Sequence, residues 1–342
     1  MRWWWVLTIL TAVSAVGAAC AEGADGPDIV VLPLANLSGR HEALLDVSPL
    51  LESELRRQGH AVMGSSEVRG LLRARRIRSM GRIGLRDARV VAEETGARYA
   101  LLGSIDLYRP ETSLELAVSA RLLDLNSMRL VGAASAGRTV QGSEGWFATG
   151  RADSIGEFLP EVVGELAARL HELLVETDRI APDHTSGIVA FVQLDNHSGR
   201  RYGAAVLLNQ LLGAWIERGI PTVEPGFVDE VLLGAQLVAR GGIANTALDL
   251  LRRELAIDWV LTGELETFDF TPSGTEAAVP SLAFGLRLVD AERHRLVSSF
   301  DLERDGLRGQ RLFQRGREHS TVGLARSCAE EAVRWFVEET RP

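Results

Sequence analysis

The pattern of apolar and polar residues predicts that short buried strands alternate with amphipathic helices along the chain. The apolar run DIVVLPLAN at 28–36, bounded by turn residues, is typical of a buried strand. A segment at 42–59 follows with apolar residues at helical spacing and ends at Gly59, the residue type that most often closes a helix in the left-handed conformation. The same two patterns return as GIVAFVQLDN at 187–196 and a helical segment at 203–219, which also ends in glycine.

Each of these beginnings is followed by the same series of predicted elements. A brief strand (HAVM or IPTV) precedes two helical stretches, three strand candidates and a long amphipathic helix. Turn residues from Asp124 and from Asp290 predict a hairpin between the last two strands of each half. The order β-α-β-α-α-β-β-β-α implies a mixed sheet with helices packed on it. The later helices are predicted at 66–74, 85–96 and 154–176, and again at 226–239, 245–256 and 320–339.

The two halves are copies of one domain. Shifting the chain by 160 positions aligns LANLSGR at 34–40 with LDNHSGR at 194–200, and ordered matches continue through Gly103 and Gly263. After a short insertion in the second copy, a shift of 166 positions aligns the last two strands and the last helix. Ordered matches over such a length indicate an internal duplication, which a single shared motif would not.

The predicted fold class is therefore α/β (α+β), with two tandem homologous domains that each have a mixed β-sheet packed with helices. The second domain is separated from the first by DRIAPDHTSG, a polar stretch with proline and glycine. The predicted segments are a signal peptide at 1–20, a short linker at 21–27, the first repeat at 28–177, a linker at 178–187 and the second repeat at 188–341.

The N-terminus has the layout of an export signal. MRWWWVLTILTAVSAVGAAC begins with one basic residue, continues with an apolar run and ends with small residues before Cys20. A cysteine at this place resembles a bacterial lipobox, in which the cysteine becomes lipidated, although Gly17 stands where a leucine-like residue is usual. Cleavage after Ala19 or Ala21 and a retained anchor are the alternatives. We expect an exported protein, held by a lipid on Cys20 on the periplasmic face of a membrane, the outer membrane.

Charge excludes some partners and marks one surface. The chain has 342 residues and a formal net charge of −9, which argues against a nucleic-acid partner. Eight arginines nevertheless gather in the middle helices of the first copy, where the corresponding stretch of the second copy keeps only Arg240. Such a cluster could contact anionic lipid headgroups or an acidic partner, or be a solvated helical face. The candidate interface residues in it are Arg73, Arg75, Arg76 and Arg78.

Catalytic, metal and cofactor motifs are not found in the sequence. It has no GxSxG elbow, no phosphate-binding loop, no HExxH and no paired-cysteine motif, so we expect no enzyme activity, no metal and no cofactor. The one polar pair repeated in a strand-to-helix loop is a candidate ligand contact at a helix N-terminus, with turn formation and capping as the structural alternative. These candidate loop residues are Asn36, Ser38, Asn196 and Ser198.

A second candidate interface emerges when the helices 42–59 and 203–219 are compared. Leu212 and Ile216 lie beside the apolar face that should cover the sheet, where the first copy has Glu52 and Arg56. We predict that they pack against the other copy, a second subunit or a partner protein, the alternative being deeper burial in their own domain.

The strand and loop VLPLANLSG, the helix ending ELRRQG, the segment GARYALLGSI and the hairpin RLLDLNSMRLV resemble a known superfamily. They are similar to the CsgG, TolB N-terminal and penicillin-binding-protein activator (LpoB-like) domains of the bacterial envelope, in two tandem copies. The resemblance implies a lipoprotein that acts through protein contacts, with an envelope protein as partner and oligomer formation possible.

We therefore expect a non-enzymatic cell-envelope lipoprotein that serves as a scaffold or regulator of a larger machine for assembly, secretion or cell-wall synthesis. One alternative is a periplasmic ligand-binding protein with a cleft between the repeats. Another is an accessory subunit of a CsgG-like secretion complex. For that role the stretch DFTPSGTEAAVPS at 269–281 is the longest candidate hairpin extension, and Pro272 and Pro280 are expected to break it.

Overall fold

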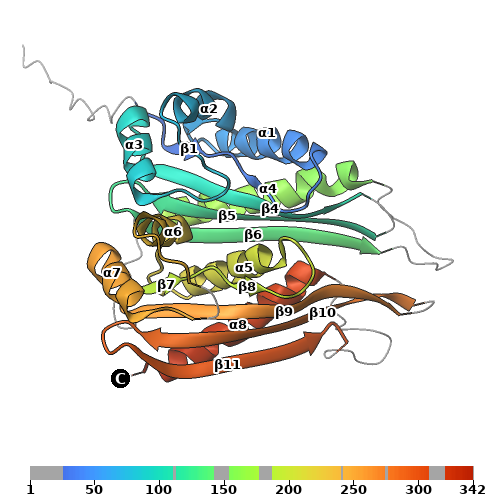
Figure 1. The fold of residues 1–342 in the computed structure, drawn as a ribbon. Coiled ribbons are helices and arrows are strands. Elements are labelled where there is room, and N and C mark those ends of the chain that lie inside the picture. The colour runs from blue at the N-terminus through green and yellow to red at the C-terminus, as the bar shows by residue number, and fades with distance from the viewer. Residues whose placement is uncertain are drawn as a thin grey trace, which may run out of the picture.

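The structure is a computed structural model of the whole chain, and it describes residues 26–110, 113–141, 154–176, 187–239, 242–273, 276–307 and 320–341. It contains two sheet–helix bodies, one built from each half of the sequence (Figure 1). This confirms the predicted fold class and the predicted order of the elements. The N-terminal segment with Cys20 lies outside the described residues.

The first body is formed by one mixed sheet with two helices on each face. Its strands run in the order β3-β1-β4-β5-β6, and the short β2 pairs with β4. β1 is parallel to β3 and β4, whereas β4, β5 and β6 form an antiparallel meander. The elements are β1 (Ile29–Val31), β2 (Ala35–Asn36), α1 (Glu42–Arg57), β3 (Val62–Met63), α2 (Ser65–Ala74), α3 (Leu85–Thr95), β4 (Tyr99–Arg109), β5 (Ser113–Asp124), β6 (Arg129–Gln141) and α4 (Ile155–Glu176).

The second body repeats this plan with strand order β11-β10-β9-β7 and β8 paired with β9. The counterpart of β3 is reduced to a single bridge between Val189 and Thr222. Its elements are β7 (Val189–Phe191), β8 (Asp195–Asn196), α5 (Gly203–Glu217), α6 (Pro225–Gly234), α7 (Asn245–Leu255), β9 (Trp259–Ser273), β10 (Glu276–Asp290), β11 (Arg295–Asp305) and α8 (Thr321–Glu339).

Helix α5 differs from its counterpart α1 because it lies between the two sheets. α1 buries one face and exposes the other, as an amphipathic surface helix does. α5 is buried around most of its circumference, because it packs on β9 and α8 of its own body and on β5 and β6 of the first (Figure 1). Its Trp215 is fully buried and contacts Phe191 and Phe336 edge-on or tilted. The wide apolar stripe of this helix therefore serves two cores at once.

Local turn chemistry explains where the elements end. Gly59 and Gly219 have positive φ after α1 and α5, as predicted. Asp124 and Asp290 accept hydrogen bonds from the backbone of the next turn residues, which confirms the predicted hairpins. The predicted helix 226–239 is shorter than expected, because the chain turns through a left-handed Gln236 after Gly234.

The predicted break at Pro272 and Pro280 is wrong. β9 runs through Ser273 and β10 begins at Glu276, so the two strands stay paired past both prolines. A register shift between Glu276 and Val279 lies beside this stretch, and proline is tolerated next to such irregularities because the ladder there lacks regular hydrogen bonds.

Candidate functional site: a buried polar network between the two bodies

Seven polar side chains are buried together where the first sheet meets α5 and the start of α6. They come from four segments that are far apart in the sequence, and their charged members are almost completely shielded from solvent: Asp106 is 0%, Arg121 2% and Glu224 1% exposed. Buried polar groups of this kind must be satisfied by one another. The seven residues, called here the interface network, are Ser104 and Asp106 on β4, Ser119 and Arg121 on β5, Asn209 and Gln210 on α5, and Glu224 before α6.

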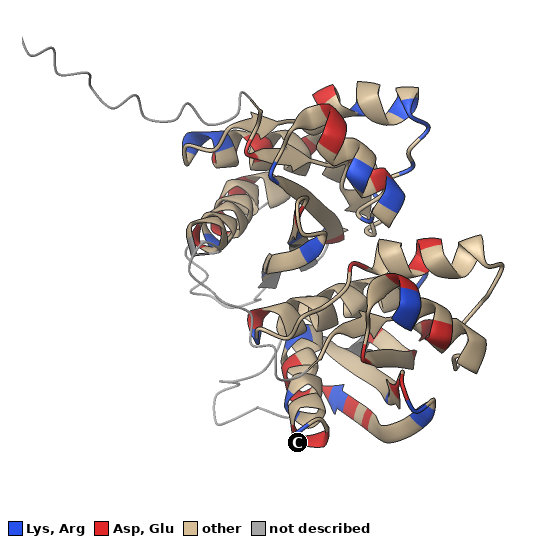
Figure 2. Ribbon diagram, turned by 90° about the vertical axis from the view of Figure 1, so that its left-hand side faces the viewer, with Lys and Arg blue, Asp and Glu red and all other residues tan. Residues whose placement is uncertain are grey.

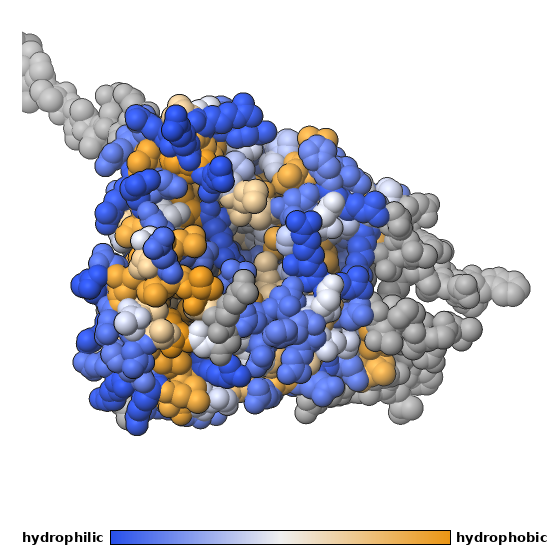
Figure 3. Space-filling view, viewed as in Figure 1, coloured by the Kyte–Doolittle hydropathy of each residue, from blue (hydrophilic) through white to orange (hydrophobic). Residues whose placement is uncertain are grey.

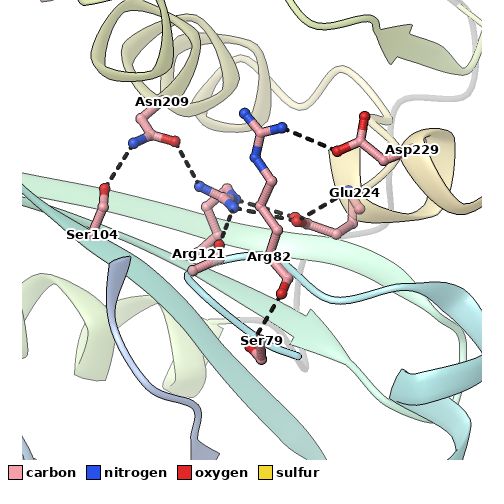
Figure 4. A network of polar contacts seen from close by, with 9 residues as sticks. Ser79, Arg82, Ser104, Arg121, Asn209, Glu224 and Asp229 are labelled. Carbon is pink, nitrogen blue, oxygen red and sulfur yellow. Dashed lines mark hydrogen bonds and ion pairs between the residues drawn. The ribbon is translucent and has the colours of Figure 1, made fainter. Parts of the chain in front are cut away.

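Arg121 is the central group of the interface network (Figure 4). Its Nε and Nη2 donate to the two carboxylate oxygens of Glu224 at 3.2 and 3.4 Å, a forked ion pair between the two bodies. Nη1 donates to Oδ1 of Asn209 at 3.0 Å, and Nη2 also donates to the carbonyl oxygen of Gly81 at 2.9 Å. One guanidinium therefore ties α5, the start of α6 and the loop before α3 to the first sheet.

Glu224 is placed by the helix that follows it. It is the N-cap residue of α6, and its side chain accepts a hydrogen bond from the backbone N–H of Gly226, with Pro225 at the first helical position. A carboxylate is favoured at a helix N-terminus because the free N–H groups and the helix dipole carry partial positive charge there. The same side chain thus caps its own helix and neutralises Arg121 across the interface.

Asp106 collects the other half of the network. Its carboxylate accepts from Ser104 Oγ at 2.6 Å, from Ser119 Oγ, from Asn209 Nδ2 at 3.1 Å and from Gln210 Nε2 at 3.3 Å. Two of these donors belong to each body. Burial is the main influence on this group and raises the pKa of Asp106 to about 6, while the hydrogen bonds from Ser104, Ser119 and Asn209 and the charge of Arg121 act in the opposite direction.

We predict that Asp106 makes the stability of the protein depend on pH. Because the pKa of Asp106 is about 6 in the folded protein and 3.8 in an unfolded chain, the folded state keeps a proton that the unfolded state has already released between these values. The contribution of Asp106 to the free energy of unfolding should therefore fall by about 2–3 kcal/mol as pH rises through this window.

Urea unfolding of Asp106→Asn at pH 4, 5, 6 and 7 tests this, since the amide cannot ionise. The part of the pH dependence between pH 4 and 6 that belongs to Asp106 should disappear. The matched control is Glu266→Gln, because Glu266 is the exposed counterpart of Asp106 in the second body and should leave the wild-type profile unchanged. An unaltered profile in Asp106→Asn would show that the buried carboxyl does not titrate in this range.

Two further groups of polar contacts lie on either side of the interface network. On one side, Arg82 Nη1 lies 3.2 Å from Asp229 Oδ2, Ser79 Oγ donates to the Arg82 carbonyl oxygen, and the N–H of Arg86 donates to Glu230 at 3.0 Å (Figure 4). This brings the start of α6 against the loop before α3, where Gly226 faces the backbone of Ile83.

On the other side, Glu115 of β5 holds the start of α8. Its Oε1 accepts from the N–H of Thr321 at 3.2 Å and from Ser320 Oγ at 3.1 Å, while its Oε2 lies 3.4 Å from Arg109 Nη1. A residue of the first body therefore supplies an acidic group to the N-terminus of the last helix of the second.

The polar groups of this site hold the two bodies together. Its donors and acceptors are bonded to one another, and its three charges comprise two carboxylates around one guanidinium, all shielded from solvent. Within the described ranges, the structure has no group of three or more His, Cys, Asp or Glu side chains that could hold a metal ion. The interface network therefore fixes one body on the other.

The residues proposed from the sequence lie elsewhere or at the margin of this site. Leu212 is fully buried in the core of the second body, a cluster that also includes Ala117 of the first sheet. Ile216 is partly buried and packs against the cluster that α2 and α3 form on the first sheet, together with Phe227. Both stay candidate interface residues. The arginines Arg73, Arg75, Arg76 and Arg78 are exposed at the end of α2, away from the network.

The two candidate loops are nearly identical in structure. Asn36 Oδ1 accepts from the N–H and Oγ of Ser38, and Asn36 Nδ2 donates to the carbonyl oxygen of Arg40 at 2.6 Å. Asn196 makes the same bonds to Ser198 and Arg200 in the second copy. These side chains shape the turn before each helix by bonding to their own backbone.

Sequence reasoning missed the interface network, although a signal for it exists. Ser104 and Asp106 interrupt the apolar strand YALLGSIDLY, and Asn209 with Gln210 interrupt the apolar helix GAAVLLNQLLGAW. Polar side chains inside two otherwise buried elements require hydrogen-bond partners, and the two sets can satisfy each other if the elements pack together.

Comparison of the sequence with family models and with curated proteins gives no match. Among solved structures, the fold is similar to that of PelC from Paraburkholderia phytofirmans, a dodecamer, with 16% identity and a TM-score of 0.31, covering 47% of this chain and 94% of that one. It is also similar to lipoprotein GNA1162 from Neisseria meningitidis, with 16% identity, a TM-score of 0.32 and coverage of 44% and 98%. A third structure is the LpoB C-terminal domain from Salmonella enterica, with 15% identity, a TM-score of 0.25 and coverage of 36% and 87%. At this level of similarity the comparisons assign the chain to no family.

Proposed function

We propose that this chain is an exported envelope protein, anchored by a lipid on Cys20, that acts without catalysis as a scaffold or regulator of a larger envelope assembly. The observation that carries the proposal is the interface network. Four of the buried charged side chains in the described ranges, Asp106, Glu115, Arg121 and Glu224, bond across the joint between the two bodies, so contacts with a partner are left to the outer surface. A rigid pair of domains on a tether can hold partners at a fixed spacing.

A ligand-binding role with a cleft between the repeats receives less support. The polar side chains that face each other between the bodies are buried and bonded to one another, so a ligand entering there would have to break Arg121–Glu224 or the contacts of Asp106. Breaking buried charge contacts in this way is costly unless the ligand replaces them.

Crosslinked envelopes test the scaffold role directly. The tagged chain should enrich a defined envelope protein after crosslinking and purification, compared with an unrelated lipoprotein that carries the same tag. Thermal-shift screening of the purified chain against small molecules is the counter-experiment. A stoichiometric ligand that raises Tm by several degrees, together with no crosslinked protein, would replace the scaffold by a ligand binder.

The anchor has its own prediction. Cys20→Ser should release the chain from the membrane fraction or leave an unprocessed precursor, because stable anchoring requires the lipids that this cysteine would carry. Cell fractionation and mass spectrometry of the mature N-terminus measure the outcome. Cys328→Ala is the matched control, since Cys328 is buried in α8 and should not affect fractionation. A mature wild-type chain that begins at Glu22 would establish cleavage without lipidation.

No helix within the described ranges has both the length and the apolar character needed to cross a bilayer.

A further inference from the structure

The arginines of the first body form an exposed edge. The segment from Arg69 to Arg89 contains eight arginines and a single acidic residue, Asp87, in a chain whose formal net charge is −9. Two of the eight are used in ion pairs, Arg75 with Glu94 and Arg82 with Asp229. Five others are exposed and form no ion pair with a described residue, and they are called here the arginine edge: Arg73, Arg76, Arg78, Arg86 and Arg89.

Three large apolar side chains stand exposed beside this edge. Met80, in the loop before α3, is 79% exposed, and Leu233 and Val238, at the end of α6 and in the loop after it, are 70% and 75% exposed. They are called here the apolar tips. Exposed apolar side chains that gather on one surface mark an interaction site more often than single ones do.

The arginine edge and the tip of α6 are neighbours. Glu230 of α6 accepts from the backbone N–H of Arg86 at the start of α3, and Leu233 lies three residues further along α6, on the same side of the helix. Figure 2 looks onto this edge and shows blue segments on the upper helices, with a mostly tan helix below them. Figure 3 shows an orange area over α6 and α7 on the left of the molecule, with blue residues above it.

The turn after α2 and the turn after α6 occupy equivalent positions in the two bodies, but their exposed side chains differ in polarity. Under the shift of 160 positions, Arg73 corresponds to Leu233 and Arg78 to Val238. One copy presents charge at this turn and the other presents apolar groups.

The chain enters the first body at the same edge. Gly26 packs against the backbone of Thr95 and Gly96 at the end of α3, and Glu94 next to them holds Arg75 at the end of α2. Five residues separate Cys20 from Gly26, so their Cα atoms can be at most ~20 Å apart. A lipid on Cys20 would therefore hold this edge close to the bilayer surface.

We propose that the arginine edge and the apolar tips form a surface that docks on an anionic lipid bilayer. Guanidinium groups bind lipid phosphates through charge-assisted hydrogen bonds, and adjacent apolar side chains enter the boundary between headgroups and acyl chains. The acidic remainder of the surface is repelled by anionic lipid, which fixes the orientation of the molecule. The proposal deepens the proposed function by giving the tethered scaffold a defined face toward the membrane.

Vesicle flotation of the chain from Ala21 onward tests it, since this chain lacks the lipid but keeps every described residue. The probes are vesicles of phosphatidylcholine alone and of phosphatidylcholine with 30% phosphatidylglycerol. The chain should float with the anionic vesicles and not with the neutral ones, and binding should weaken as salt rises.

Two variants separate the two parts of the surface. Arg73→Gln with Arg78→Gln and Arg89→Gln should weaken binding to anionic vesicles at least tenfold and reduce its dependence on salt. Leu233→Ser with Val238→Ser should weaken binding while leaving the salt dependence in place. The matched control replaces three exposed arginines elsewhere, Arg138, Arg169 and Arg201, by glutamine and should bind as the wild type does.

Three outcomes would overturn the proposal: no binding of the wild type to anionic vesicles, equal loss in the control triple variant, or a concentration-dependent dimer that the arginine variant abolishes. The last result would assign the surface to a second copy of the chain. None of them bears on the lipid anchor or on crosslinking to a partner, which test the proposed function by separate readouts. Unchanged Tm of each variant shows that the fold is intact.

Discussion

Replacing Arg121 by methionine should lower the free energy of unfolding by about 3–5 kcal/mol, the usual cost of removing one partner from a buried ion pair. Methionine fills much of the same volume, so the loss comes from charge and hydrogen bonding. Glu224 would be left 1% exposed without its cation, and Asn209 and the carbonyl of Gly81 would lose a donor. Urea denaturation of the whole chain at pH 7 measures the difference.

The second body supplies the control at the equivalent place. Arg287 occupies the position of Arg121 in the second sheet, but it pairs with Glu264 at 2.9 Å in a setting where their side chains are 40% and 31% exposed. Exposed pairs contribute about 0–1 kcal/mol, so Arg287→Met should have little effect. Equal destabilisation by the two substitutions would mean that the Arg121 contacts are no stronger than a surface ion pair.

Replacing Gly226 by alanine should force the two bodies apart where α6 meets the loop before α3. A Cβ atom at this position would lie 2.1 Å from the carbonyl oxygen of Ile83 and 2.6 Å from its carbon. These are backbone atoms, which cannot rotate away as a side chain can. We expect a loss of about 1–3 kcal/mol, as for other overpacked sites, together with weaker Arg82–Asp229 and Arg121–Glu224 pairs.

Gly234→Ala is the matched control on the same helix. A Cβ there meets nothing within 4 Å, and alanine is also the residue of the first copy, Ala74, so stability should be unchanged or slightly higher. Thermal unfolding compares the two variants, and protease cleavage in the loop before α3 reports whether that contact has opened. A Gly226→Ala protein as stable and as resistant as Gly234→Ala would contradict the close approach.

The helices and strands could be predicted from the sequence because each has its own pattern of apolar and polar residues and each pattern occurs in both halves of the chain. The helix predicted at 85–96 is found at Leu85–Thr95, and the one predicted at 245–256 at Asn245–Leu255. Comparing the copies filters out accidental patterns, since a core position must stay apolar in both. The end of α6 was misplaced because a non-glycine residue, Gln236, takes the left-handed conformation there, and nothing in the local pattern indicates this.

The interface network was not accessible in the same way. Arg121 and Glu224 are 103 residues apart, and Arg121 and Asn209 are 88 apart, so no periodicity connects them. The comparison of copies also works against their detection, because Arg121 corresponds to Arg287 whereas the partners of Arg121 and Asp106 differ between the copies. Asn209 and Gln210 correspond to Pro49 and Leu50, and Ser104 to Glu264. What the helix patterns do show is that α5 has more apolar surface than α1, and the structure accounts for it by placing α5 between two sheets.

The same differences determine how far this architecture can be extended. A third domain added after the second would have to seat its helix on the outer face of β9 and β10, where Glu264 and Glu266 stand in place of Ser104 and Asp106 and where Arg287 is already engaged by its own sheet. A domain placed before the first would have to receive α1, which offers proline and leucine where α5 offers two amides. Stacking by this contact is thus directional: the order of the halves cannot be exchanged without losing the joint that holds them.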